Sequence, residues 1–116
     1  MNIKNVTINN YNFAFVGEYK SSRYGFTHAC TLFINEQNRS AASVHYLNRT
    51  WETYRFQTVY RLAIHKLISD LVSRLEREYK ELHGYKRMTA QRRADFNASI
   101  ADHETLAAYR AALAQL

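Results

Sequence analysis

The segment YRLAIHKLISDLVSRLEREYKELHG, residues 60–84, decides the fold class, because its apolar residues recur at steps of three and four. This spacing places them on one stripe of a long α-helix. The members of the stripe are Tyr60, Ile64, Leu67, Ile68, Leu71, Leu75, Tyr79 and Leu82. Gly84 then predicts the end of the helix, since glycine readily adopts the left-handed conformation. Spacing of four residues also predicts the ion pairs Asp70–Arg74 and Glu76–Lys80.

Before position 56, β-branched and aromatic residues occur at alternate positions, which is typical of β-strands. A first strand is predicted at residues 11–16, and a polar break follows at residues 20–23. A second strand is expected from Tyr24 to Ile34, a turn at residues 35–38, and a third strand from Ser40 to Leu47. The connections are too short for crossover helices, so the strands should form an antiparallel meander.

Two shorter helices are predicted in the C-terminal third. Thr89 can cap a helix that runs towards Asn97, and Asp102 can cap another from His103 to the end. We therefore predict a single α+β domain spanning residues 1–116. It should contain a three- to four-stranded antiparallel sheet packed by one long helix and followed by two short C-terminal helices. The short fourth strand is expected near residues 51–55.

The composition excludes several classes of protein. Hydrophobic residues make up 47% of the 116 residues, too many for a disordered chain. The single cysteine excludes an intramolecular disulfide and fits a reducing compartment. No apolar run reaches the roughly 20 residues that a membrane helix needs, so we expect no membrane partner. Residues 1–10 are polar and do not resemble a secretory signal. Lys and Arg outnumber Asp and Glu by 16 to 10, which gives a net charge of +6.

No set of residues predicts catalysis, a metal or a cofactor. His28, Cys30 and His45 could begin a zinc site, but their spacing matches no zinc motif, so we interpret them as packed side chains. Cys30 lies mid-strand among apolar neighbours, which favours an inert thiol over a nucleophile. Three glycines cannot build a phosphate-binding loop. We therefore predict a protein that is not an enzyme.

Arginine and aromatic residues are interleaved between residues 19 and 56, which is typical of surfaces that stack on nucleic acid. The same combination is common at protein interfaces. A third interpretation is a sheet whose rings are core and whose arginines form a solvated rim. The sequence leaves all three open, and Trp51 could equally fill the junction of sheet and helix. The expected contacts are Arg23, Tyr24, Arg49, Tyr54 and Arg55.

A second basic cluster consists of Lys86, Arg87, Arg92 and Arg93, with no acidic residue between Gly84 and Ala94. Such a cluster could hold backbone phosphates or an acidic protein face. It could also be a solvated loop and helix start. Basic residues near a helix N-terminus oppose the helix dipole, so this placement does not stabilise the helix. We therefore include all four residues among the expected partner- or nucleic-acid-binding residues.

The segments SRYGFTH (residues 22–28), YLNRTWETY (46–54) with Phe56-Gln57, and GYKRMT (84–89) resemble small proteins encoded by bacteriophages and other mobile elements. Some proteins of this size in that group are anti-CRISPR proteins, which bind a Cas effector or its nucleic acid. The resemblance implies an inhibitor in the cytoplasm of a bacterial host cell. It assigns no site residues, because no specific anti-CRISPR motif is present.

Three functional hypotheses follow. The first is a non-catalytic phage or mobile-element protein that inhibits a host defence nucleoprotein, such as a CRISPR effector, by occluding a nucleic-acid or partner-binding surface. The second is a module that binds DNA or RNA directly. The third is an assembly protein whose long helix mediates dimerisation, and the sequence does not decide the oligomeric state.

Overall fold

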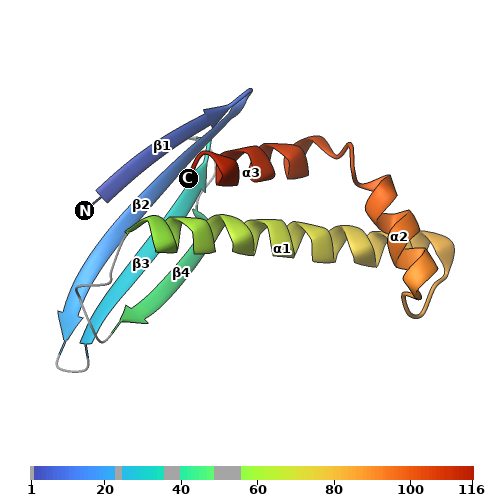
Figure 1. Ribbon diagram of the computed structural model, residues 1–116, viewed down its shortest axis with the longest axis horizontal. Helices are drawn as coiled ribbons and strands as arrows, with labels where there is room; N and C mark the ends of the chain where they lie inside the picture. The colour runs from blue at the N-terminus through green and yellow to red at the C-terminus, as the bar shows by residue number, and fades with distance from the viewer. Residues whose placement is uncertain (1, 23–24, 36–39, 49–55) are drawn as a thin grey trace.

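The fold is α+β, with an antiparallel sheet on one side and three helices on the other (Figure 1). The computed structural model describes residues 2–22, 25–35, 40–48 and 56–116. The strands are β1 (Asn2–Ile8), β2 (Tyr11–Ser22), β3 (Gly25–Ile34) and β4 (Ser40–Asn48). The helices are α1 (Phe56–His83), α2 (Ala90–Ser99) and α3 (Glu104–Ala114). The predicted fold class, with one long helix and two short C-terminal ones, is confirmed.

The strands form a meander in the order β1-β2-β3-β4, and each pairs with its neighbour in antiparallel fashion. A two-residue turn at Asn9 and Asn10 connects β1 to β2, and Asn9 has a φ of 51°. Asparagine tolerates this left-handed conformation better than most residues. The fourth strand is thus N-terminal, in a segment where we predicted none. The predicted strand near residues 51–55 lies outside the described residues. β2 also continues through the predicted polar break as far as Ser22.

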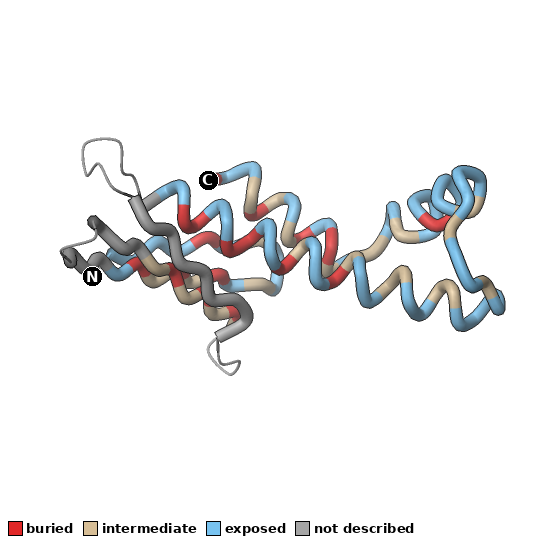
Figure 2. The backbone as a smooth tube through the Cα atoms, turned by 90° about the horizontal axis from the view of Figure 1, so that it is seen from below, coloured by how far each residue is buried: buried red, intermediate tan, exposed pale blue. Residues whose placement is uncertain are grey.

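The core lies between one face of the sheet and the helices α1 and α3 (Figure 2). Alternate residues of a strand point to the same face, so β2 and β3 each supply a row of apolar side chains. The largest fully buried side chains of β2, β3 and α1 are Phe13, Phe15, Cys30, Leu32, Val59 and Ile64. Burial of each large side chain contributes roughly 1.5–3 kcal/mol. Small residues of α3, Ala108 and Ala112, are buried in the same cluster.

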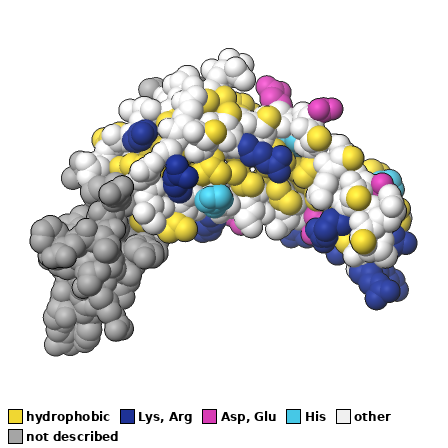
Figure 3. Space-filling model, in the orientation of Figure 1, with side chains coloured by type: hydrophobic (Ala, Val, Ile, Leu, Met, Phe, Trp, Pro, Cys, Tyr) yellow, Lys and Arg dark blue, Asp and Glu magenta, His cyan; other side chains and the backbone are white. Residues whose placement is uncertain are grey.

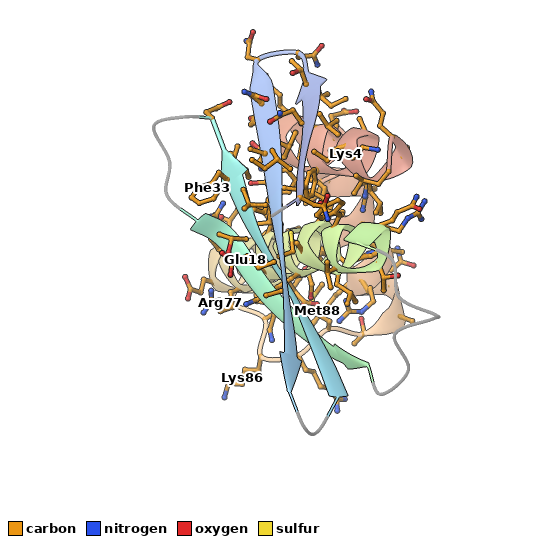
Figure 4. The ribbon with its side chains drawn as sticks, turned by 90° about the vertical axis from the view of Figure 1, so that its left-hand side faces the viewer. Lys4, Glu18, Phe33, Arg77, Lys86 and Met88 are labelled. Carbon is orange, nitrogen blue, oxygen red and sulfur yellow. The ribbon has the colours of Figure 1, made fainter. Side chains whose placement is uncertain are left out.

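The opposite face of the sheet carries no described helix. Figure 4 shows Phe33 and Glu18 on this outer side, and Lys4 on the side of the helices. The chain end is held on the helical side, where the Gln57 side-chain amide donates a hydrogen bond to the Leu116 carbonyl oxygen. This contact joins the start of α1 to the end of α3.

Helix α1 is longer than the sheet that it covers. Its 28 residues span about 42 Å at 1.5 Å per residue. The last buried members of its apolar stripe are Leu67 and Leu71, whereas Leu82 is 82% exposed. The stripe is therefore not buried at its C-terminal end, because that end extends beyond the sheet (Figure 1). The helix ends as predicted, with Gly84 at a φ of 68°.

The N-terminal cap of α2 is the predicted residue, whereas the N-terminal cap of α3 is not. The Thr89 hydroxyl oxygen accepts a hydrogen bond from the Arg92 amide at 3.3 Å, as expected for the cap of α2. Asp102 does not cap α3. The cap is His103, whose Nδ1 accepts from the Leu106 amide at 3.3 Å. None of the described helices combines the length and the apolarity of a transmembrane span.

Candidate functional site

The structure describes one of the two predicted surfaces. Arg23, Tyr24, Arg49, Tyr54 and Arg55 lie outside the described residues, so the arginine and aromatic surface of the N-terminal half stays a prediction. The second basic cluster is described completely. It lies on the connection between α1 and α2 and on the first turn of α2.

These basic residues belong to what we call the distal lobe, defined as residues 76–99. It consists of the last two turns of α1, the connection 84–89 and helix α2. Figure 1 shows α2 across the far end of α1, at the end of the molecule opposite to the sheet. In the space-filling view, Lys and Arg side chains gather at this end (Figure 3). The long helix thus holds a basic surface away from the main core.

A small aromatic cluster holds the distal lobe together. Phe96 of α2 is 1% exposed, and its ring centroid lies 5.4 Å from that of Tyr79. Tyr79 also contacts His83 at 4.3 Å, and His83 stacks on Tyr85 at 5.3 Å with an angle of 17° between the rings. His83 was not predicted as part of this cluster. Its signal was the spacing of four residues from Tyr79, which places both rings on one side of a helix.

Arg92 fixes the connection between α1 and α2. Its guanidinium carbon lies 3.9 Å from the centre of the Tyr85 ring, within the range of a cation–π interaction. Its Nη1 also donates a hydrogen bond to the Arg87 carbonyl oxygen at 3.3 Å. Arg92 therefore joins α2 to the connection, and part of its donor capacity serves the fold.

Arg93 is engaged on the other side of α2. Its Nη2 lies 2.6 Å from Oε1 of Glu76, an oxygen shielded from solvent. Glu76 thus pairs with Arg93 across two helices, and not with Lys80 as the spacing predicted. Arg74 likewise contacts Glu78, at 4.0 Å, in place of the expected Asp70. The pair Glu76–Arg93 fixes the position of α2, because removal of either partner leaves a charge without its counterion.

Lys86 and Arg87 differ from the two arginines of α2. Both are exposed, and neither side chain has an ion-pair partner among the described residues. Lys86 projects away from the ribbon in Figure 4. The backbone that carries them is fixed by Gly84, by the Thr89 cap and by the Arg92 hydrogen bond. The distal lobe therefore presents two exposed cations, which have no ion-pair partner among the described residues and can bind phosphate.

Of His28, Cys30 and His45, Cys30 is the residue whose side chain the structure describes. Cys30 is fully buried, and burial raises the pKa of its thiol to about 12 although a backbone hydrogen bond from Val16 opposes the shift. The thiolate needed for nucleophilic attack is therefore disfavoured. The β3–β4 register pairs Cys30 with Val44, and His45 with Ala29. No group of three metal-ligating side chains occurs among the residues that the structure describes.

The sequence matches no protein-family model, and neither a curated protein nor a solved structure matches it.

Proposed function

We propose that this chain is a non-catalytic binding protein whose distal lobe engages an anionic macromolecular surface. The observation that carries the proposal is a pair of exposed cations, Lys86 and Arg87, which have no ion-pair partner among the described residues and lie on a connection fixed by Arg92 and Thr89. A fixed backbone reduces the entropy lost on binding. The net charge of +6 further favours association with a negatively charged partner.

The mechanism of such a protein is occlusion. The distal lobe lies at the end of α1, away from the sheet (Figure 1). It can therefore bind a surface of the partner while the rest of the chain blocks access to that surface. A nucleoprotein is a suitable target, because its nucleic acid is anionic and its activity requires access. The resemblance to phage proteins supports a host defence nucleoprotein, such as a CRISPR effector, as that target.

The inhibitor proposal is tested by co-purification with a panel of CRISPR effectors and by their cleavage activity. We expect one effector to bind the chain and to lose cleavage. The variant Lys86→Ala/Arg87→Ala should restore cleavage, and Arg61→Ala/Lys66→Ala, which removes two exposed cations elsewhere on α1, should not. Normal cleavage by every effector in the presence of the wild-type chain would contradict the proposal.

Direct binding of DNA or RNA is the second candidate, favoured by the exposed cations Lys86 and Arg87, which follow the aromatic pair His83–Tyr85 along the chain. Affinity for nucleic acid falls with salt, and each phosphate contact contributes a slope of about 0.7–0.9 in log K against log salt. The Lys86→Ala/Arg87→Ala variant should therefore lose a slope of about 1.4–1.8. Arg61→Ala/Lys66→Ala serves as the control of equal charge. If low-salt mobility shifts detect no complex, this candidate is rejected.

A further inference from the structure

A hollow of about 290 Å³ lies between α1 and α3, on the sheet side of the connection 84–89. Its apolar wall is formed by Leu67 and Leu71 of α1, which are almost completely buried. Five polar side chains complete the lining, three from α1 and two from α3: Asp70, Arg74, Arg77, Thr105 and Tyr109. Ligand sites in proteins have this character, with an apolar wall and a few convergent polar groups. Figure 3 shows Lys and Arg side chains bordered by hydrophobic atoms over the middle of α1.

Two guanidinium groups on the α1 side have donors to spare. Arg74 and Arg77 are three residues apart, so they lie on the same side of the helix. The acidic contact of Arg74 is Glu78 at 4.0 Å, and both side chains are more than half exposed, which makes this a weak pair. Arg77 has no ion-pair partner in the described part of the chain. Both side chains can therefore bind an anion without breaking a strong internal contact.

The α3 side supplies two hydroxyl groups. The Thr105 hydroxyl lies 3.0 Å from the Tyr11 hydroxyl, and this hydrogen bond fixes its position at the edge of the hollow. Burial raises the pKa of the Tyr109 phenol, Tyr11 adds to the effect, and Arg74 opposes it. Tyr109 is therefore protonated at neutral pH and can donate a hydrogen bond. These hydroxyls and the two guanidiniums give more donors than the two oxygens of a carboxylate can accept.

We propose that the hollow between α1 and α3 binds a small phosphorylated ligand that also carries a hydroxyl group. The phosphate would accept hydrogen bonds from Arg74, Arg77 and the α3 hydroxyls, since each of its three terminal oxygens can accept more than one hydrogen bond. Asp70 would accept a hydrogen bond from the ligand hydroxyl. The two arginines outnumber the one carboxylate, so the lining retains a positive charge for the anion. This site shares only Arg77 with the distal lobe and includes none of the four residues of the basic cluster, so it does not depend on the function proposed for that cluster.

The test is a titration of the labelled protein, followed by the NMR signals of its backbone amides. The probes are ribose 5-phosphate, inorganic phosphate and ribose. We expect ribose 5-phosphate to shift the signals of Arg77, Thr105 and Tyr109 saturably, inorganic phosphate to bind more weakly, and ribose to cause no shift. Arg77→Gln and Arg74→Gln should each weaken binding of ribose 5-phosphate at least about tenfold, because each removes a charge-assisted hydrogen bond.

The matched control is Arg87→Gln, which removes the same charge from the connection 84–89, outside the lining of the hollow, and should leave the affinity unchanged. Arg74 and Arg77 are exposed, so their variants should fold, and an unchanged spectrum of the β-strands verifies this. The proposal is overturned if ribose 5-phosphate shifts no signal from α1 and α3. It is equally overturned if the shifts are confined to residues 84–93, or if Arg77→Gln and Arg74→Gln bind as the wild type does.

Discussion

Cys30 illustrates how burial controls the chemistry of a single residue. Its side chain is fully enclosed between the sheet and α1, and burial raises its pKa from 9.0 to about 12. The unfolded chain therefore loses the thiol proton near pH 9, whereas the folded chain retains it up to about pH 12. Between these values the unfolded state binds fewer protons than the folded state, so ionisation favours unfolding.

We predict that Cys30 makes the protein less stable as the pH rises from 9 to 12. The free energy of unfolding should fall by up to about 1.4 kcal/mol per pH unit more in the wild type than in Cys30→Ala. Below pH 9 the difference between the two proteins should be constant. Urea denaturation at several pH values measures this. Parallel pH profiles for the two proteins above pH 9 would show that the thiol does not titrate as described.

Gly84 gives a second prediction at the level of the residue. Its φ of 68° is strained for residues with a Cβ atom, yet no atom lies within 4 Å of where that Cβ would be. Gly84→Ala should therefore cost about 1 kcal/mol of stability from backbone strain alone. Gly84→Asn should cost less, because asparagine tolerates this conformation. Thermal unfolding compares the three proteins, and equal melting temperatures for glycine and alanine would contradict the explanation.

Among the elements, α2 depends on few contacts. Phe96 is its buried residue, and the pair Glu76–Arg93 supplies its ionic contact with α1. We predict that Phe96→Ala, a substitution that usually costs about 3–5 kcal/mol in a core, loosens the distal lobe while the sheet remains folded. Hydrogen exchange should then accelerate in residues 90–99 and stay unchanged in β2 and β3. Uniform acceleration across all strands would show that the lobe and the main core unfold as one unit.

The elements also show which features the sequence could predict. Gly84 acts through its own backbone, and the Thr89 hydroxyl accepts from the amide of Arg92 three residues later, so local sequence predicted both ends of the α1–α2 connection correctly. Strand β1 was missed because Asn2, Lys4 and Asn5 are exposed on an edge strand and hide the alternation. Its signal was the turn formed by the adjacent asparagines 9 and 10.

Contacts between elements were harder to predict than the elements themselves. The pair Glu76–Arg93 joins residues of two helices, and no spacing along one helix can indicate it. The same holds for the hollow, whose polar side chains come from α1 and α3. For the candidate site, the sequence predicted the basic cluster, but it did not predict that two of its four residues would be held by internal contacts and two would not. Arg92 and Arg93 contact other residues of the distal lobe, whereas Lys86 and Arg87 have no ion-pair partner in the part of the chain that the structure describes.

For the whole molecule, the long helix sets the shape. The Cα radius of gyration is 16.9 Å, and the extents are 51 × 32 × 22 Å. A compact domain of this length would have a radius of gyration of about 13 Å. The difference arises because the second half of α1 carries the distal lobe beyond the sheet (Figure 1). The basic surface can therefore meet a large partner before the rest of the chain does.

We predict that X-ray scattering in solution gives a radius of gyration near 17 Å for the monomer. A lobe folded back on the sheet would bring the value towards about 13 Å, because the chain would then approach the compact limit. Lys86→Ala/Arg87→Ala should leave the value unchanged, since these side chains project into solvent and hold no element in place. A concentration-dependent increase would instead indicate self-association, as the helix-mediated assembly hypothesis requires. A concentration-independent value near 13 Å would remove the geometric basis for occlusion, because the lobe would no longer stand clear of the sheet.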